Sequence, residues 1–296
     1  MLIRIATRAS ALARWQADHV ALLLTGATPD VRVEVVPLTT EGDRRTDVPL
    51  SEIGGKGVFA TEVQAAVLEG RADVAVHSAK DLPALTPDGL VIAAVPERGD
   101  PRDALVGCRL IELPTDASVA TGSARRRVQL AHLRPDLRFS ELRGNMATRL
   151  EKAAGFDAIV VAAVALERLG LSDRLTEVLS PMLMVPQVAQ GALAVECRSG
   201  DGDLRGTLAA IEHGPSRTAV DTERAFLTEL GGDCTLPAGA YATLLDDGVI
   251  RLRAVLGDDP DADGRVAVHR SSADGTDPVA LGRSVAASLR NRPTGP

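Results

Sequence analysis

Aromatic residues are scarce in this 296-residue chain: four Phe, one Trp and one Tyr make up 2% of it. The aliphatic residues must therefore fill the cores, and a hydrophobic fraction of 45% allows them to do so. Proteins that hold single-stranded nucleic acid stack its bases on aromatic rings, and the net charge of −7 gives no general attraction for phosphate. A nucleic-acid-binding function is therefore not expected.

Cysteines and long apolar runs are also few. The three cysteines are far apart and form no Cys-x-x-Cys pair, which argues against a disulfide framework and against a metal site. No run approaches the roughly 18 apolar residues that a membrane-spanning helix needs. The N-terminus enters a strand pattern at once, with no basic region followed by an apolar stretch, so we expect no secretory signal. These features predict a cytoplasmic protein.

A chain of this length is long for a single core and predicts two or three domains. Strand patterns alternate with helix patterns, which is typical of βαβ units and a mostly parallel sheet. The first unit is expected to contain strands at 2–7, 31–37 and 73–77 and helices at 11–24 and 61–69. Leu12, Trp15, His19 and Leu22 are placed near one face of the first of these helices.

A second unit repeats this plan, with strands at 118–121 and 157–165 and a basic helix at 124–133. In both units a strand ends in Ala-Thr, and a short turn then leads through Ser10 or Ser123 into a helix. Free N–H groups and hydroxyls at a helix N-terminus can bind carboxylates, although Ser is also an ordinary N-cap. A third unit follows, with a helix at 219–230, two strands at 240–245 and 249–256 across an Asp-Asp-Gly turn, and a terminal helix at 278–289.

Residues 72–83 read Ala-Asp-Val-Ala-Val-His-Ser-Ala-Lys-Asp-Leu-Pro. A short buried strand is followed by a polar segment and then by Pro83, which cannot donate to a sheet. Open α/β sheets bind their ligands at the carboxyl ends of strands. Spacing alone leaves two interpretations open: a ligand-binding loop, or a strand end whose Lys80 and Asp81 pair in solvent.

Arginines gather at Arg125, Arg126 and Arg127, with Arg143 and Arg149 further on. They form either a solvated helix face, as most charge runs do, or a local cationic site on an acidic protein. The planar guanidinium suits carboxylates, so a row of arginines would suit a polyanionic ligand.

Together these segments resemble signatures of the hydroxymethylbilane synthase (porphobilinogen deaminase) family, in the family's order over roughly the first 240 residues. The matching segments are residues 4–10, 54–59, 72–83, 97–103, 142–149, 190–192, 223–225 and Cys234. The resemblance implies two periplasmic-binding-protein-like βαβ lobes with a cleft between them, plus a small α+β C-terminal domain. The boundaries are expected at 1–96 with 192–212 for lobe 1, 97–191 for lobe 2, and 213–296 for the third domain.

By this resemblance the protein condenses four porphobilinogen molecules into a linear tetrapyrrole and releases four ammonia. Asp81 is the expected catalytic residue, because a carboxylate can stabilise the pyrrole cation that deamination leaves. His77 is interpreted as structural. Cys234 is expected to carry a dipyrromethane cofactor through a thioether, whereas Cys108 and Cys197 are interpreted as small buried hydrophobes.

The remaining site residues follow from the same resemblance. The expected contacts of the cofactor are Ser78, Lys80, Thr121, Ser123, Arg125, Arg126 and Gly144. The expected contacts of the substrate are Arg8, Ser10, Lys56, Arg143, Arg149 and Gln190. Lys56 lies in a Gly-Gly-Lys-Gly run that lacks phosphate-loop spacing and predicts either a lid or a plain surface turn.

Three positions depart from the family pattern. Gly122 replaces a hydroxyl residue, Ala189 replaces a glycine, and Asp233 places a negative charge beside Cys234. That charge should raise the pKa of the thiol and slow its alkylation. A monomeric enzyme is expected, with no membrane or nucleic-acid partner. The alternative is a two-lobed protein that binds an anion or senses an effector without catalysis.

Overall fold

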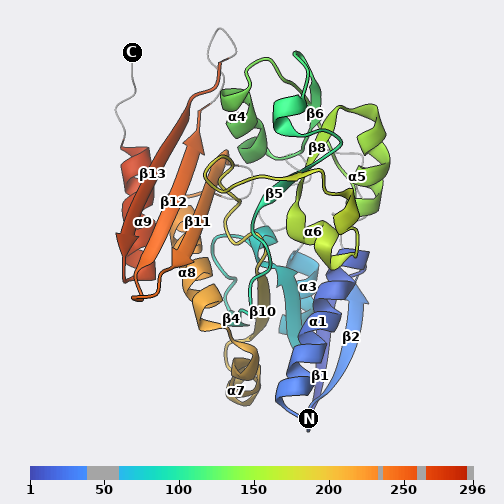
Figure 1. Cartoon of the computed structure of the whole chain (residues 1–296). Helices are drawn as coiled ribbons and strands as arrows, with labels where there is room; N and C mark the ends of the chain where they lie inside the picture. The colour runs from blue at the N-terminus through green and yellow to red at the C-terminus, as the bar shows by residue number, and fades with distance from the viewer. Residues whose placement is uncertain (39–59, 233–235, 259–264, 292–296) are drawn as a thin grey trace. The chain divides into compact units, whose positions relative to one another are not determined.

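The computed structural model describes residues 1–38, 60–232, 236–258 and 265–291. The chain divides into two compact units (Figure 1). Unit 1 comprises Met1–Gly99 and Gly191–Arg217, and unit 2 comprises Asp100–Gln190 and Thr218–Pro296. Each unit is described by itself below.

Unit 1 is built on a five-stranded sheet with the order β2-β1-β3-β10-β4. The strands are β1 (Leu2–Arg8), β2 (Arg32–Leu38), β3 (Val74–Ser78), β4 (Leu90–Ala94) and β10 (Leu193–Arg198). β1 runs parallel to β2 and β3, as expected, whereas β10 is antiparallel to both β3 and β4. Four of the five strands therefore run in the same direction, and the prediction of a mostly parallel sheet is confirmed. β10 runs against them because it enters the sheet from the segment that returns from unit 2.

Helices cover both faces of this sheet. They are α1 (Ala11–Ala27), α3 (Thr61–Leu68) and α7 (Gly202–Leu208). Alternating residues of β1 and β3 point to opposite faces, so that Ile5 packs in a cluster with α1 while Ala6 packs in another with α3. The helix α1 buries Gln16, Ala17, Val20 and Leu24, whereas Leu22 is exposed. Trp15 and His19 lie on one face, as predicted, and their rings stack with centroids 5.0 Å apart.

Unit 2 contains a second five-stranded sheet, with the order β7-β6-β8-β5-β9. Its strands are β5 (Asp103–Val106), β6 (Ser118–Ala120), β7 (Arg138–Ser140), β8 (Ala158–Ala162) and β9 (Glu177–Val178). Its helices are α4 (Ala124–Leu133), α5 (Met146–Lys152) and α6 (Ala163–Arg168). The strand expected at 157–165 ends at Ala162, because the chain continues into α6 at Ala163.

The C-terminal part of unit 2 has its own antiparallel sheet, with the order β11-β12-β13. It comprises β11 (Ala238–Leu244), β12 (Ile250–Gly257), β13 (Val268–Gly275) and α9 (Pro278–Arg290). It also includes α8 (Gly214–Glu229) from Thr218 onward, since the first residues of this helix belong to unit 1. Figure 1 shows α9 lying along β12 and β13, and both strands contact it. The predicted class, two βαβ lobes with a small α+β C-terminal domain, is confirmed.

Candidate active site

The expected site residues of unit 1 follow two neighbouring parallel strands. Arg8 ends β1 and Ser10 comes just after it, while Ser78 ends β3 and is followed by a short 3-10 turn, Ala79–Asp81. Because β1 and β3 are parallel neighbours, their carboxyl ends meet at one edge of the sheet. The structure therefore brings Arg8, Ser10, Ser78, Lys80 and Asp81 to the same edge.

Ser10 and Ser78 are held by hydrogen bonds at this edge. The Ser10 hydroxyl accepts from the N–H of Ala13 at 3.4 Å and so caps α1, as predicted. The Ser78 hydroxyl accepts from the side-chain amide of Gln16 at 2.7 Å. Gln16 is buried on α1, and it was not identified from the sequence. A polar residue on the buried face of an amphipathic helix indicates a hydrogen-bond partner, and could have revealed this contact.

His77 makes a buried contact with the neighbouring strand β10. Its Nε2 lies 3.1 Å from a carboxylate oxygen of Glu196 on β10, and both residues are buried. The same oxygen of Glu196 accepts from Gln64 of α3 at 2.8 Å. This contact supports the interpretation of His77 as a structural residue that ties β3 to β10.

Unit 2 presents a comparable edge. Thr121 follows β6, its N–H donates to Ser140 of β7 at 2.9 Å, and its hydroxyl accepts from the N–H of Ser123 at 3.2 Å. The Ser123 hydroxyl accepts from the N–H of Arg126 and caps α4. Because β6 and β7 are parallel, the segment after β7, which carries Arg143, lies at the same edge as Thr121 and Ser123.

The segment after β7 is a tight turn with a guanidinium on either side. Gly144 has a φ of +114°, a backbone conformation that favours glycine, and its carbonyl accepts from Arg149 Nε at 2.8 Å. Nη1 of Arg143 is buried and has no hydrogen-bond partner among the described residues. A buried donor without an acceptor is unfavourable, so this nitrogen suits an anionic ligand.

Arg125 and Arg126 are held in a buried network instead of forming a solvated helix face. Only 2% of Arg125 and 6% of Arg126 is exposed, and both pair with the fully buried carboxylate of Asp103 on β5. Gln190 donates to the same carboxylate at 3.0 Å. Burial would raise the pKa of the Asp103 carboxyl, but the two arginine charges outweigh it and hold that pKa far below its usual range.

Two of the departures from the family pattern have a structural explanation. A Cβ at Gly122 would lie 2.9 Å from both the carbonyl oxygen of Leu142 and a carboxylate oxygen of Glu141, so a larger residue requires this segment to shift. Ala189 has a φ of +57°, and its N–H donates to the buried carboxylate of Glu223 at 2.6 Å. The same carboxylate accepts from Ala242 of β11 at 2.8 Å. Glu223 therefore holds the strained residue against β11.

Two expected residues, Lys56 and Cys234, lie outside the described residues, as does Asp233. Of the other two cysteines, Cys197 is buried as expected, whereas Cys108 is only partly buried. Cys197 is fully buried in unit 1, where burial raises the pKa of its thiol to about 11, and Cys108 packs against the core of unit 2. A high pKa leaves little thiolate near neutral pH, so Cys197 is poorly suited to alkylation.

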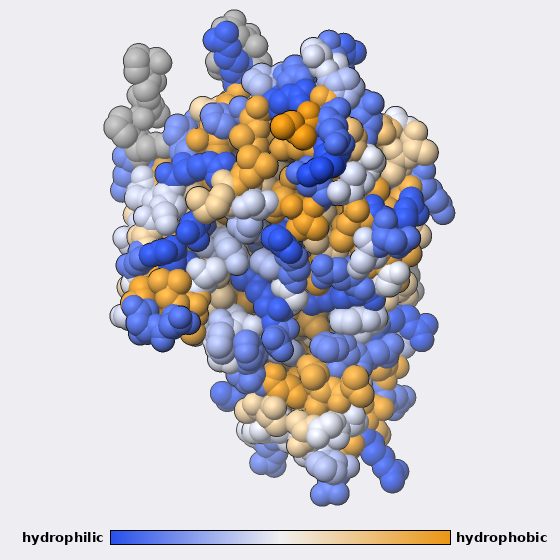
Figure 2. All heavy atoms as spheres, viewed as in Figure 1, coloured by the Kyte–Doolittle hydropathy of each residue, from blue (hydrophilic) through white to orange (hydrophobic). Residues whose placement is uncertain are grey.

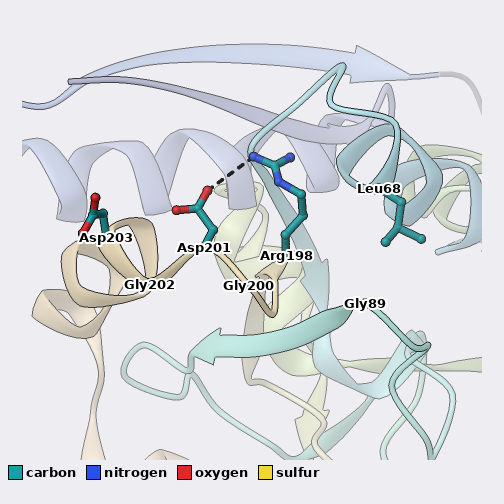
Figure 3. Close-up of a pocket in the computed structure, with 7 residues that line it drawn as sticks. All are labelled: Leu68, Gly89, Arg198, Gly200, Asp201, Gly202 and Asp203. Atoms are coloured by element: carbon teal, nitrogen blue, oxygen red, sulfur yellow. Dashed lines mark hydrogen bonds and ion pairs between the residues drawn. The ribbon is translucent and has the colours of Figure 1, made fainter.

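A pocket of about 640 Å³ opens at another place in unit 1 (Figure 3). It is lined by Leu68, Gly89, Arg198, Gly200, Asp201, Gly202 and Asp203. Arg198 ends β10, which is antiparallel to β3, so this pocket lies at the sheet edge opposite to Ser78. Arg198 already donates to backbone carbonyls of Val67 and Ala72 and pairs with Asp201, and we assign the pocket no part in the reaction.

Within the described ranges, no group of three or more His, Cys, Asp or Glu side chains could hold a metal ion. None of the described helices is long and apolar enough to cross a membrane. Figure 2 shows hydrophilic residues over the presented face of both units, with hydrophobic ones in small groups between them.

The chain is an α/β protein in which each unit carries hydroxyl and guanidinium groups at a carboxyl edge of its sheet, an arrangement suited to an anionic ligand. Comparison with known proteins is more specific. Residues 3–206 match the family model described as porphobilinogen deaminase, dipyromethane cofactor binding domain, and residues 217–291 match the C-terminal domain of porphobilinogen deaminase. The chain therefore belongs to the porphobilinogen deaminase family.

Curated relatives agree with this assignment. The chain is 47% identical over 298 residues to a porphobilinogen deaminase of Acidothermus cellulolyticus, covering 97% of this chain and 88% of the relative. It is 45% identical over 293 residues to that of Chromobacterium violaceum, covering 97% and 94%.

Two solved structures show a weaker similarity. A YaeC-family lipoprotein of Enterococcus faecalis has a TM-score of 0.43 at 12% identity, covering 72% of this chain and 92% of its own. A nutrient binding protein of Burkholderia cenocepacia bound to methionine has a TM-score of 0.44 at 13% identity, covering 77% and 95%. These scores are too low to support a fold, so the architecture rests on the strand orders given above.

Proposed function

We propose that this chain is a hydroxymethylbilane synthase, which joins four porphobilinogen molecules head to tail and releases four ammonia. Membership of the porphobilinogen deaminase family carries this proposal. Each condensation breaks the bond between the aminomethyl carbon and its nitrogen, and forms a bond from that carbon to the free pyrrole carbon of the chain. Release breaks the bond between the primer and the first methylene carbon of the chain: water gives its hydroxyl to that carbon and a proton to the pyrrole carbon left on the primer.

Asp81 is the proposed catalytic residue. Loss of ammonia leaves a pyrrole cation, and a carboxylate about 4 Å from it at an effective dielectric near 20 stabilises it by about 4 kcal/mol. That is worth roughly a thousandfold in rate. The 3-10 turn after β3 fixes the carboxylate at the sheet edge, and the same group can receive the proton from the reacting pyrrole and pass it to the departing amine.

The donor set fits the polycarboxylate cofactor of this family. Buried Nη1 of Arg143 lacks an acceptor among the described residues, and Arg125 and Arg126 together carry one more charge than Asp103 neutralises. We propose that Ser78, Lys80, Thr121, Ser123, Arg125, Arg126 and Gly144 hold the cofactor. We further propose that Arg8, Ser10, Lys56, Arg143, Arg149 and Gln190 bind the substrate and the growing chain. When bound, the cofactor supplies the primer from which the chain grows.

The point of attachment is proposed to be Cys234, through a thioether. Support comes by contrast from Cys197, which has no exposed surface, whereas Cys108 is partly buried against a core cluster. We also propose the domain limits stated above, a monomeric state, a cytoplasmic location and no nucleic-acid partner, which the net charge of −7 supports.

The intact mass of the purified chain tests this function. We expect an adduct of two pyrrole units on the wild type and on Cys108→Ser and Cys197→Ser, each with turnover of porphobilinogen to the tetrapyrrole. Cys234→Ser should fold but carry no adduct and show no turnover. Folded wild-type protein without adduct or turnover would favour the anion-binding alternative, and pyrroles mapped to Cys108 or Cys197 would refute the attachment.

A further inference from the structure

Asp103 is the point at which the buried arginines of unit 2 meet. Its carboxylate has no exposed surface. One oxygen accepts from Arg125 Nη1 at 2.7 Å, and the other accepts from Arg126 Nε at 2.9 Å and from Gln190 Nε2 at 3.0 Å. The sequence places Asp103 at the end of a matching segment but assigns it no role.

Backbone carbonyls also accept hydrogen bonds from both guanidinium groups. Arg125 Nη1 also donates to Val185 at 2.7 Å, and Arg126 Nη1 donates to Val160 of β8 at 2.9 Å. Each guanidinium is therefore held at two sides, by Asp103 and by a carbonyl. Such multiple contacts leave a planar group little freedom to rotate.

The charges of this cluster do not balance. Among the described residues, the ion pairs of Arg125 and Arg126 are both with Asp103, so two positive charges share one negative charge. Arg125 Nε is also buried and has no acceptor there. An excess charge in a site shielded from water is unfavourable unless an anion compensates it.

This excess charge lies in the first turn of α4, which begins at Ala124. The N-terminus of a helix carries a partial positive charge, and here Ser123 and Thr121 add hydroxyls beside it. A charge held in a low-dielectric site is screened weakly, so it acts on a carboxylate bound at this helix end.

We propose that Asp103 is a positioning residue: it holds Arg125 and Arg126 in the first turn of α4, so that their one uncompensated charge is directed at carboxylates of the bound pyrrole chain. The inference rests on the proposed function. Without the shared carboxylate, the two guanidinium groups lose their common acceptor and repel each other. The bound chain is then held in the wrong place for the next condensation.

Asp103→Asn is the first test, because it keeps the shape but removes the charge. Its control is Asp136→Asn, which removes a carboxylate paired with Arg134 at 2.6 Å near the surface of the same unit. The unfolding midpoint, kcat and KM for porphobilinogen, and the intact mass of enzyme-bound species are measured for each. Misplacement of a reacting group by about 1 Å can cost about a hundredfold in rate.

We expect the folded Asn variant to lose about a hundredfold in kcat and to lack the primer or to stall before four added units. The control should stay within twofold of the wild type in kcat and carry a full primer. Asp103→Glu, which keeps the charge and moves it by one methylene, should regain the primer and a kcat between those of Asn and the wild type.

If folded Asp103→Asn has the kcat of the wild type and carries the full primer, the proposal is overturned, whatever the unfolding midpoint of this variant. The proposal is also overturned if Asp103→Glu has no higher kcat and no more primer than Asp103→Asn, since the charge at this position would then not matter. If neither variant folds, Asp103 serves the fold alone and the proposal is likewise wrong. A wild type without primer or turnover would instead count against the proposed function.

Discussion

At the scale of single residues, the proposed role of Asp81 depends on where its carboxylate is held. Asp81 lies on a 3-10 turn at the carboxyl edge of unit 1, half-buried and directly after the strand that carries Ser78. A short turn of this kind holds its side chain more closely than a long loop does. Substitutions of Asp81 can therefore separate the effect of the carboxylate's position from the effect of its charge.

Asp81→Asn keeps the size of the side chain but cannot neutralise the pyrrole cation. We expect substrate binding to survive and ammonia release to fall roughly a thousandfold. Asp81→Glu keeps the charge but moves it by one methylene, which should leave about 1% of the activity. Ammonia release under single-turnover conditions measures both, and an Asn variant as fast as Glu would exclude charge stabilisation as the role of Asp81.

At the scale of elements, α4 and the segment after β7 carry arginines of two kinds. Arg143 and Arg149 are partly exposed at the sheet edge, whereas Arg125 and Arg126 are buried against Asp103. The first kind keeps part of its surface open to solvent, and we expect it to contact a ligand. The second kind supports the core through buried ion pairs.

We expect Arg143→Leu and Arg149→Leu to fold with little loss of stability and to stall at different stages of chain growth. The loss of a charge-assisted contact costs about 1.5–3 kcal/mol in binding. Arg125→Leu leaves Asp103 without one of its partners, and should lower the free energy of unfolding by about 3–5 kcal/mol. Urea unfolding and intact mass measure the two effects. Normal chain growth in Arg143→Leu and Arg149→Leu would show that neither arginine grips the chain.

The packing of α8 on α9 depends on Gly282. A Cβ at this position would contact the carbonyl of Thr222 and lie 2.8 Å from the Cβ of Ala225. Gly282→Ala should therefore destabilise the protein by about 1–3 kcal/mol through overpacking. Gly206→Ala on α7 is the matched control, because nothing lies within 4 Å of its added Cβ, and it should stabilise by about 0.5–1 kcal/mol. Equal unfolding midpoints for the two variants would contradict this packing.

At the scale of the whole molecule, each unit uses a carboxylate to bind two arginines. In unit 1, Asp73 accepts from Arg4 on β1 and pairs with Arg198 on β10. Burial would raise the pKa of the Asp73 carboxyl, but hydrogen bonds from Arg4 outweigh it and lower that pKa. In unit 2, burial would likewise raise the pKa of the Asp103 carboxyl, but the charges of Arg125 and Arg126 outweigh it and lower that pKa.

The lowered pKa values of Asp73 and Asp103 predict that the folded protein loses stability in acid. The folded-state pKa of each carboxyl lies below its unfolded value of about 3.9, so its contribution to stability is fully present well above pH 4. It is lost as the pH falls below 4 toward the folded-state pKa. Thermal unfolding between pH 7 and pH 2.5 should show this fall, and Asp73→Asn should reduce its slope. A wild-type midpoint that stays constant down to pH 2.5 would contradict the prediction.

Much of the architecture could be predicted from local patterns. The alternation of strands and helices, the caps at Ser10 and Ser123, and the hairpin around the Asp-Asp-Gly turn depend on neighbouring residues, and all are present in the structure. The family assignment also came from short segments in order, and the comparisons confirm it. Local chemistry was sufficient here because caps, turns and motifs are formed by residues that are close in sequence.

Other features depended on contacts between residues far apart in sequence. The direction of β10 depends on the path of the chain between two units, and the buried face of α1 depends on which of its sides meets the sheet. The arginines of α4 formed a recognisable cluster in the sequence, but their common partner, Asp103, lies 22 residues before Arg125. The sequence alone indicated an arginine cluster suited to carboxylates, and its family resemblance assigned Asp81 to a pyrrole cation. Only the tertiary structure decided which of the arginines are buried against a carboxylate, because burial and charge balance are set by packing between distant segments.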